Sequence, residues 1–287
     1  MKKIAVIDIG SNSVRLMFVA DGKILYKTLE ITRLGEGLAV SGSLQPAAIG
    51  RSAEAVAQFY TRAQREGAQQ IRAFATAAVR SAKNGDEFVE AVRALCGLEV
   101  EVISGEEEAE IGILGALGNA DGGIIDIGGA STEIIVQQGG KILYEKSVNV
   151  GVVRLKDVCG DDIGKLATYT NAAAYEFHEV PKARMRAIGG TATSLAAIAL
   201  GLKEYDSAAV TGYVLTEESL LSAVEYLANN IPERVAEETC VPLKRAEVLL
   251  GGGIWLMQLL RNLELDGVIV SDADNLEGFA RKKGLMD

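Results

Sequence analysis

The chain has 287 residues, 48% hydrophobic and 24% charged, a composition typical of a soluble globular protein long enough for two domains. Its formal net charge of −10 argues against general binding to nucleic acid or to a membrane surface. The longest uncharged stretch, residues 187–202, contains Gly, Thr and Ser and is too short to span a bilayer.

The first half of the chain is predicted to hold three strands, followed by helices and strands in alternation. Residues 4–7 are continuously apolar, as expected of a strand covered on both faces. Asp8 ends this run, so we interpret the N-terminus as a strand and not as a signal peptide. Strands are predicted over residues 3–8, 13–20, 23–32, 70–75 and 99–103, and helices over residues 45–66, 82–95 and 105–118.

The second half opens on a copy of this beginning. DIGSNSVRLMFVADGKILY, at residues 8–26, recurs without a gap as DIGGASTEIIVQQGGKILY at residues 126–144. Each copy has an acid at the end of a buried strand, then a glycine-containing turn whose backbone N–H groups can bind an anion. The repeat predicts two similar domains with these turns on either side of a cleft. The alternative is that both copies are hairpins of one sheet.

The rest of the second half continues in the same alternating style. Strands are predicted over residues 122–127, 132–138, 141–149, 184–188 and 268–270, and helices over residues 151–158, 163–179, 191–200, 216–229, 232–238 and 244–263, with a short terminal helix. The predicted fold is α/β, with mixed sheets flanked by helices in two domains, residues 1–120 and 121–287. We expect a hinge near residue 120, with the terminal helix free to pack back on the first domain.

Two helices carry glycines that suggest close contacts. Glu108, Gly112 and Gly115 share one helical face. Residues 251–253 are three glycines in mid-helix, each costing about 1 kcal/mol relative to Ala, which is tolerated where a backbone or ligand comes near. Crossing helices at the domain interface would explain both; the alternative is a helix that breaks at residue 251.

Few chemistries remain open to this chain. Its single histidine, His178, lies between aromatic and acidic residues, so we predict a structural role and exclude a multi-histidine metal site. Cys96, Cys159 and Cys240 are far apart and odd in number, which indicates neither a zinc site nor a disulfide framework. We expect a cytoplasmic protein whose chemistry uses carboxylates, hydroxyls, backbone amides and arginines.

Three consecutive glutamates precede the first glycine-bearing helix face. Acids in the first turn of a helix offset its macrodipole, and this suffices to explain Glu106 and Glu107. It does not explain why Glu108 begins the glycine face, so we predict that Glu108 is catalytic.

The motifs, in this order and spacing, resemble the exopolyphosphatase and guanosine pentaphosphate phosphohydrolase family of the actin-like ATPase superfamily. They are DIGSNS at 8–13, TRLGEGL at 32–38, ATAAVRSAKN at 75–84, SGEEEA at 104–109, DIGGASTE at 126–133, GVVRL at 151–155, IGGTATSL at 188–195 and SDADNLEG at 271–278. The resemblance covers nearly the whole chain and implies two ribonuclease-H-like domains with phosphate bound between them.

The resemblance also implies a role for individual residues. It makes Glu108, Asp126 and Glu133 catalytic, with Asp8, Asp126 and Glu133 as ligands or orienting acids for Mg²⁺. It assigns phosphate binding to Asp8, Ser11, Asn12, Ser13, Arg15, Arg33, Arg80, Gly128, Gly129, Ser131, Thr132, Arg154, Gly189, Gly190 and Thr191. The alternative for each arginine is a surface salt bridge.

The sequence departs from the family pattern in three places. Ala130 replaces the usual third glycine of DIGGGSTE and resists a positive φ. Asp274, Asn275 and Leu276 stand where the family usually shows Gly-Leu-Arg, which removes a positive charge. The helical region with a histidine-aspartate pattern that longer members carry is absent from this sequence, so we expect the short, two-domain form.

The resemblance implies a Mg²⁺-dependent phosphohydrolase that removes the terminal phosphate of inorganic polyphosphate, with short chains favoured, or of guanosine pentaphosphate. Polyphosphate or a guanosine polyphosphate is the expected partner, nucleic acid and membrane are not, and a homodimer is left open. Two alternatives remain, because a fold does not fix a reaction. One is a nucleotide-dependent kinase or ATPase, and the other is a sensor that binds polyphosphate or guanosine nucleotides without turnover.

Overall fold

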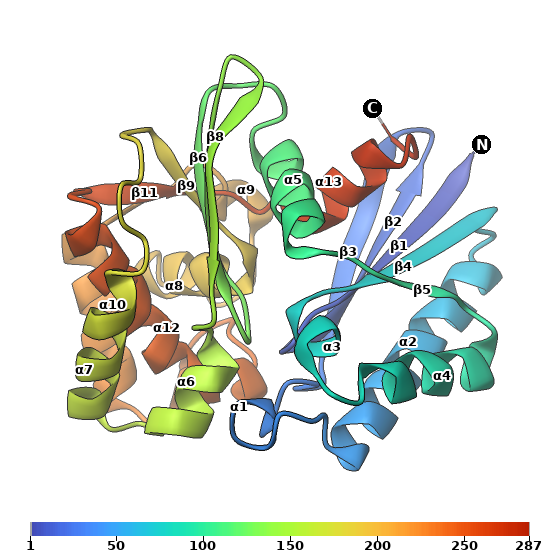
Figure 1. Ribbon diagram of the computed structural model, residues 1–287, viewed down its shortest axis with the longest axis horizontal. Helices are drawn as coiled ribbons and strands as arrows, with labels where there is room; N and C mark the ends of the chain where they lie inside the picture. Colours follow the sequence, from blue (N-terminus) through green and yellow to red (C-terminus); the bar gives the residue numbers. More distant parts are fainter. Residues whose placement is uncertain (1, 287) are drawn as a thin grey trace. The chain divides into compact units, whose positions relative to one another are not determined.

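The computed structural model describes residues 2–286, which form two compact units, each built around one sheet (Figure 1). Unit 1 comprises the chain up to Gly115 and the residues from Asn275 onward, and unit 2 comprises Ala116–Asp274. The change of unit thus falls at residues 115 and 116, where the sequence analysis placed a boundary near residue 120, and the terminal helix joins unit 1.

The sheet of unit 1 has five strands in the order β3-β2-β1-β4-β5. They are β1 (Lys3–Ile9), β2 (Ser13–Ala20), β3 (Lys23–Ile31), β4 (Gln70–Ala75) and β5 (Val100–Val102). β1 pairs antiparallel with β2 and parallel with β4, and β4 is parallel to β5. The carboxyl ends of β1, β4 and β5 therefore meet at one edge of the sheet, the edge where open α/β sheets bind ligands.

Both faces of this sheet are covered by helices. Alternate residues of a strand point to opposite faces, so each strand contributes to both apolar layers. Ile7 and Leu16 pack with α2 (Pro46–Arg65) and α4 (Gly85–Cys96), whereas Val6 and Met17 pack on the other face with α5 (Gly105–Ala116) and α13 (Asn275–Lys282). Asp8 follows the period of Val6 and so projects to the face of α5 and α13. Two short helices that the sequence analysis did not predict, α1 (Leu38–Ser41) and α3 (Ala77–Ser81), complete the unit.

The sheet of unit 2 has six strands in the order β10-β11-β9-β6-β7-β8. They are β6 (Gly122–Ile127), β7 (Thr132–Gln138), β8 (Lys141–Val148), β9 (Met185–Ile188), β10 (Val214–Thr216) and β11 (Gly267–Val270). The helices are α6 (Val152–Cys159), α7 (Ile163–Ala174), α8 (Gly189–Ala199), α9 (Ser207–Val210), α10 (Glu217–Asn229), α11 (Pro232–Glu238) and α12 (Leu243–Asn262). α9 and β10 were not predicted. No helix within residues 2–286 is long and apolar enough to cross a membrane.

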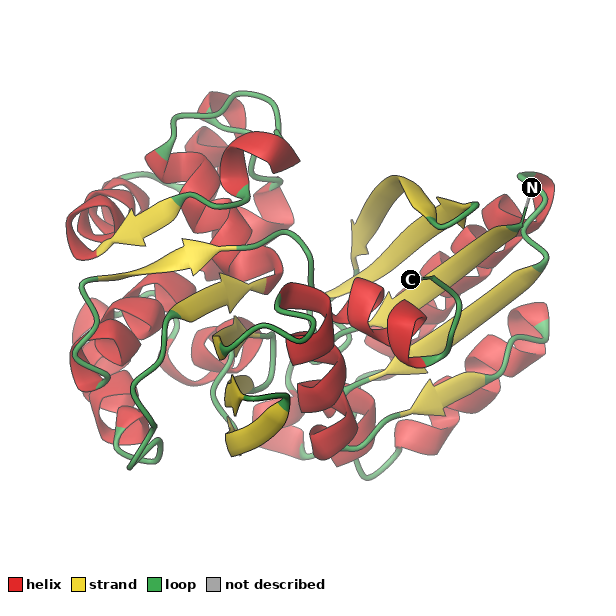
Figure 2. Cartoon of the chain, turned by 90° about the horizontal axis from the view of Figure 1, so that it is seen from above, coloured by secondary structure: helices red, strands yellow, loops and turns green. Residues whose placement is uncertain are grey.

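The repeated sequence builds the same structure twice. Residue 8 lies opposite residue 15 in the β1–β2 pair, and residue 126 lies opposite residue 133 in the β6–β7 pair, so the offset of 118 residues is preserved in the register. The bulge between Phe18 and Val19 recurs between Val136 and Gln137, at the same offset. The two copies belong to different sheets, each flanked by helices (Figure 2). The interpretation as two hairpins of one sheet is therefore wrong. The prediction of two mixed sheets flanked by helices is confirmed.

The three glycines of α12 pack inside unit 2. The helix runs unbroken from Leu243 to Asn262, so the predicted alternative of a break at residue 251 is wrong. A methyl group on Gly252 would lie 2.7 Å from Thr191 Cγ2 and 2.8 Å from Val152 Cγ1. The nearest atoms around all three glycines are side chains of unit 2, and the expectation that they serve a contact between domains is therefore wrong.

Substituting Gly252 tests this packing. We expect Gly252→Ala to lower the free energy of unfolding by about 1–3 kcal/mol, because an added methyl overfills a closed site. Gly50→Ala in α2 is the matched control, since nothing lies within 4 Å of the new methyl. It should raise that free energy by about 0.5–1 kcal/mol. Urea unfolding of both variants measures the difference, and equal shifts would contradict the close packing.

Candidate active site

The first Asp-Ile-Gly turn, at the end of β1, is held by its own backbone and by the connection after β3. Gly10 N donates to Ser13 O at 3.0 Å, which closes the turn, and the backbone amides of Thr32 and Arg33 both donate to Asn12 O, at 3.1 and 2.9 Å. Ser11 and Ser13 are buried beside this connection. The structure therefore brings the predicted residues 11–13 and Arg33 together in unit 1.

The connection after β3 is itself fixed by an arginine that the sequence analysis missed. Arg33 has a φ of 51°, a left-handed conformation that non-glycine residues adopt only under constraint. Arg51 of α2 donates to Thr32 O and Arg33 O and pairs with Glu36 at 2.6 Å. Arg51 thus holds the carbonyl groups of the segment that carries Arg33.

Asp8 and Arg15 form an ion pair across β1 and β2. They lie directly opposite each other in the register, and Arg15 Nε donates to Asp8 Oδ2 at 3.0 Å, with a second bond from Arg15 Nη2. Asp8 is only 2% exposed, so its charge requires such a partner. The pair places a guanidinium beside the first turn, where an anion would lie.

Glu108 projects from the first turn of α5 into the same cluster. Ser104 caps the helix by accepting a hydrogen bond from Glu107 N at 3.0 Å. Glu108 is 7% exposed, and its Oε2 accepts a hydrogen bond from Arg80 Nη1 at 2.8 Å. Arg80 also donates to Ile103 O at 3.0 Å, which fixes its guanidinium.

Burial raises the pKa of the Glu108 carboxyl above its ordinary range. Arg80 opposes this rise by its charge and hydrogen bond, nearby Asp8 adds to it, and a hydrogen bond from Thr76 lowers the pKa. These groups come from the ends of β1 and β4 and from the helices that follow β4 and β5. A buried carboxyl of raised pKa, held in place by an arginine, can serve as a general base.

The pH dependence of turnover tests this arrangement. The carboxylate is the active form of a base, so the acidic limb of kcat/KM should lie above the ordinary range of glutamate. Arg80→Gln should move this limb to higher pH, because the opposing positive charge is lost. Arg93→Gln, at an exposed arginine of α4, is the control and should leave the limb in place. An acidic limb that stays in place or moves to lower pH in Arg80→Gln would contradict the coupling between Arg80 and Glu108.

The second turn, at the end of β6 in unit 2, repeats the first. Gly128 N donates to Ser131 O at 3.0 Å, as Gly10 does to Ser13. Gly129 O accepts hydrogen bonds from the amides of Val153 and Arg154, at 2.9 and 3.1 Å. Arg154 Nε also donates to Ala130 O at 3.0 Å, so the predicted Arg154 lies against this turn through a backbone contact and not through a surface salt bridge.

Ala130 and Thr132 fit this turn without strain. Among residues 2–286 the non-glycine residues with positive φ are Asp21, Arg33, Glu179 and Glu264, so Ala130 needs no left-handed conformation. Thr132 is buried, donates to Val150 O and accepts from Trp255 Nε1 at 2.8 Å. Thr132 is therefore tied to the core of unit 2, whereas its neighbour Ser131 ends the turn.

Asp126 and Glu133 form a carboxylate pair on one face of the sheet. They are opposite each other in the antiparallel register, which places both side chains on the same face. Glu133 is 4% exposed and accepts a hydrogen bond from Ser147 Oγ at 2.6 Å. Gly189, with a φ of 78°, brings its backbone so near that a methyl group there would lie 2.7 Å from Asp126 Oδ1. The segment of residues 189–191, here named the third loop, therefore adjoins the second turn, with Thr191 Oγ1 donating to Ile127 O at 2.8 Å.

The donor set of unit 2 suits a magnesium ion. Mg²⁺ is usually bound through one or two carboxylates, with water and substrate phosphates completing its oxygen ligands. Asp126 and Glu133 supply such a pair. Asp8, the third predicted ligand, belongs to unit 1. Within that unit it pairs with Arg15.

Besides Arg51, two more polar residues of these clusters were not found from the sequence. Thr76 directly follows β4, as the first turn follows β1, and this position at a strand end could have identified it. Arg245 of α12 lies over the third loop, where its Nη1 is 3.2 Å from Gly190 O and 3.4 Å from Ser194 Oγ. No local pattern indicates Arg245, because the contact joins residues far apart in the sequence.

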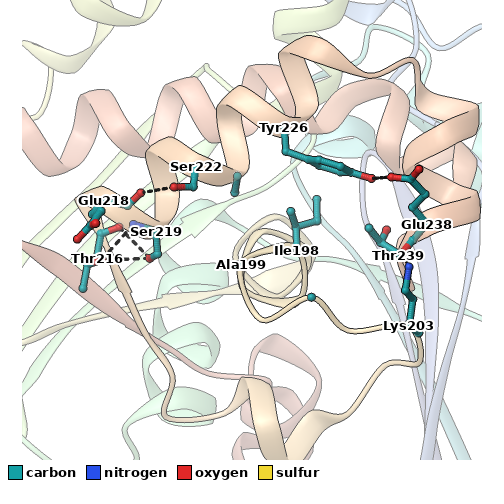
Figure 3. Close-up of a pocket in the computed structure, with 12 residues that line it drawn as sticks. Ile198, Ala199, Lys203, Thr216, Glu218, Ser219, Ser222, Tyr226, Glu238 and Thr239 are labelled. Atoms are coloured by element: carbon teal, nitrogen blue, oxygen red, sulfur yellow. Dashed lines mark hydrogen bonds between the residues drawn. The ribbon is translucent and has the colours of Figure 1, made fainter.

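A hollow of ≈ 640 Å³ in unit 2 does not coincide with any predicted site residue. It lies between the C-terminal part of α8, α10 and α11 (Figure 3), whereas Gly189 and Gly190 begin α8 at its other end. Its polar side chains bond within the wall, since Tyr226 donates to Glu238 at 3.0 Å and Ser222 to Glu218 O at 3.1 Å. The predicted site residues therefore lie at the strand ends described above and not in this hollow.

Comparison with known proteins decides the family. A family model described as the Ppx/GppA phosphatase family matches residues 4–283. The chain belongs to the Ppx/GppA phosphatase family. This membership confirms the predicted resemblance and the prediction of a hydrolase-type enzyme.

Similar proteins align with nearly the whole chain. An exopolyphosphatase 2 of Mycobacterium tuberculosis is 29% identical over 98% of both chains. A guanosine-5'-triphosphate,3'-diphosphate pyrophosphatase of Vibrio campbellii is 31% identical over 98% of this chain, which spans 58% of that protein. The crystal structure of the Aquifex aeolicus Ppx/GppA family member superposes with a TM-score of 0.77 at 29% identity, covering 99% of this chain and 98% of the other. The fold derived above is thus the Ppx/GppA fold.

Proposed function

We propose that the protein hydrolyses the terminal phosphoanhydride bond of inorganic polyphosphate or of guanosine pentaphosphate, with Mg²⁺ as cofactor. The observation that carries this proposal is the buried Glu108 carboxyl of raised pKa, bonded to Arg80 within the cluster that holds Asp8 and the first turn. The names of the two relatives support the substrate class, because one is an exopolyphosphatase and the other acts on a guanosine polyphosphate.

In the proposed reaction, water attacks the terminal phosphorus in line with the bond that breaks. The new P–O bond gives inorganic phosphate, the anhydride P–O bond breaks, and the shortened chain leaves with the bonding electron pair. Glu108 accepts the proton that the attacking water loses. Phosphoryl transfer requires mainly positioning and neutralisation of charge, and this chain supplies amide-rich turns and arginines for both.

Each unit would contribute a different charge. In unit 1, Arg15 and Arg80 lie beside the first turn and would hold equatorial phosphate oxygens. In unit 2, Asp126 and Glu133 would hold the Mg²⁺. When bound, this ion neutralises phosphate charge and orients the substrate. The second turn, with Gly128, Gly129 and Ser131, and the third loop would then bind the phosphates next in line.

Phosphate release tests the proposal directly. The full chain is incubated with Mg²⁺ and, separately, tripolyphosphate, long-chain polyphosphate, guanosine pentaphosphate or ATP, and the same series is repeated with EDTA. We expect Mg²⁺-dependent release from tripolyphosphate or from guanosine pentaphosphate that exceeds release from ATP. Phosphate transfer from ATP to an acceptor would favour a kinase, and binding of polyphosphate without release would favour a sensor; either result would overturn the proposal.

A further inference from the structure

The last helix of the chain, α13, completes the apolar face on which α5 lies. Phe279 of α13 stacks on Phe74 of β4 with ring centroids 4.4 Å apart. Leu276 and Ala280 join the same buried cluster, to which α5 contributes Ile111. Figure 1 shows α13 beside α5 within unit 1. In this cluster, α5 and α13 therefore pack together against the same face of the sheet.

A glycine allows α13 to touch the backbone of α5. A methyl group on Gly278 would overlap the carbonyl oxygen of Ile111, and its carbon would lie 2.9 Å from Ile111 Cα. Real Cβ atoms do not approach backbone so closely, so only glycine fits this crossing. Ile111 is one helical turn after Glu108. A change in the position of α13 against Ile111 therefore also moves the Cα and Cβ atoms of Glu108.

An arginine of α13 holds the end of α5. Arg281 Nη1 donates to Leu114 O at 2.9 Å and to Gly115 O at 3.3 Å. The last carbonyl groups of a helix have no partner within it, and a positive side chain there satisfies them and complements the helix dipole. Arg281 thus anchors α5 at the residues where the chain leaves unit 1.

A lysine of α13 holds the beginning of α5. Lys282 Nζ lies 2.6 Å from a carboxylate oxygen of Glu110 and 3.3 Å from one of Glu107. These two glutamates flank Glu108, whose own side chain projects instead to Arg80. The contacts of Gly278, Arg281 and Lys282 therefore lie on both sides of Glu108 along α5.

We propose that α13 positions the catalytic helix α5, with Gly278 and Arg281 as positioning residues for Glu108. This rests on the proposed function, in which Glu108 accepts the proton of the attacking water. The substrate does not need to contact α13 for this role. Loosening α13 should therefore slow the chemical step and leave substrate binding almost unchanged, because a displacement of about 1 Å at a reacting group costs on the order of a hundredfold in rate.

Arg281→Ala in the full chain tests the proposal. We expect kcat for tripolyphosphate, per folded molecule, to fall about tenfold to a hundredfold while KM changes by less than about threefold. Amide hydrogens of residues 105–116 should exchange faster, whereas those of α2 stay unchanged. Arg281→Lys should recover part of kcat, since a lysine can reach one carbonyl group. Arg93→Ala is the matched control, because Arg93 lies in the last turn of α4 and pairs with Glu90 and Glu99.

Gly278→Ala provides an independent variant. It should lower kcat at least as far as Arg281→Ala, again with KM retained in the folded fraction. Wild-type kcat in both variants, or losses of kcat and KM that match those of Arg93→Ala, would overturn the positioning role. Glu108→Gln is measured in parallel: if it stays fully active, the proposed function fails, whereas an inactive Glu108→Gln with normal Arg281→Ala and Gly278→Ala contradicts only the role of α13.

Discussion

Glu108→Gln is expected to lower kcat for phosphate release by about 10²–10⁴-fold with little change in KM, because a general base contributes on this scale and the amide cannot accept the proton. Gln keeps the size of the side chain and can still accept a hydrogen bond from Arg80 through its carbonyl oxygen. The loss would therefore report on chemistry and not on shape. Glu106→Gln is the control, since Glu106 lies in the same first turn and is exposed. Full activity of Glu108→Gln would remove the base from the mechanism.

Stability gives a second readout of the same variant. Because the pKa of Glu108 is raised in the folded protein, the folded state holds this proton more tightly than the unfolded chain. The stabilisation is therefore complete below the unfolded pKa of about 4.5 and is lost as pH rises through the folded value. Glu108→Gln lacks this titration, so its free energy of unfolding should fall less than that of the wild type over that interval. If the unfolding free energies of the two proteins changed with pH in parallel, a buried Glu108 carboxyl of raised pKa would be contradicted.

Asp126→Asn is expected to lower Mg²⁺-dependent phosphate release by about a hundredfold or more, since charge neutralisation by the metal contributes several kcal/mol to the transition state. Added Mg²⁺ should recover part of the rate, because Glu133 would still be present to hold the proposed ion. The measurement is phosphate release over a Mg²⁺ titration. We expect the half-saturating Mg²⁺ concentration to rise in the variant.

Asp121→Asn is a matched control at the other end of β6. Asp121 Oδ1 accepts a hydrogen bond from Gly139 N at 2.7 Å, which an asparagine carbonyl oxygen can also accept. This variant should keep the wild-type dependence on Mg²⁺. If Asp126→Asn also kept it, the metal would not be held by the pair in unit 2.

Most of the fold could be predicted from the sequence because its elements are long and periodic. The gapless repeat indicated equivalent units, and the register of β1–β2 and β6–β7 confirms that equivalence. The shortest helices, such as α1 and α9, were missed because four residues are too few to show a period. β10 was missed for a related reason, since Thr216 ends this strand and caps α10 at once.

The parts of the candidate site that are local in sequence could be predicted, whereas the side-chain pairs between distant segments could not. The glycine-containing turns and Glu108 were visible as local patterns. The Arg80–Glu108 pair depends on the parallel pairing of β4 with β1 and β5, which no local pattern fixes. The role of Gly278 was equally hidden: helix crossing was predicted at Gly112, Gly115 and glycines 251–253, whereas the contact of α13 with the α5 backbone depends on Gly278.

The packing of residues after Asp274 on unit 1 also bears on the order in which the chain can fold. Unit 2 is continuous in sequence, whereas the apolar cluster that joins β1, β2 and α5 includes Leu276 and Phe279. During synthesis, this surface of unit 1 therefore stays uncovered until the residues that follow unit 2 have left the ribosome. Unit 1 begins before unit 2 in the sequence, yet its packing is completed only after all of unit 2 has been translated.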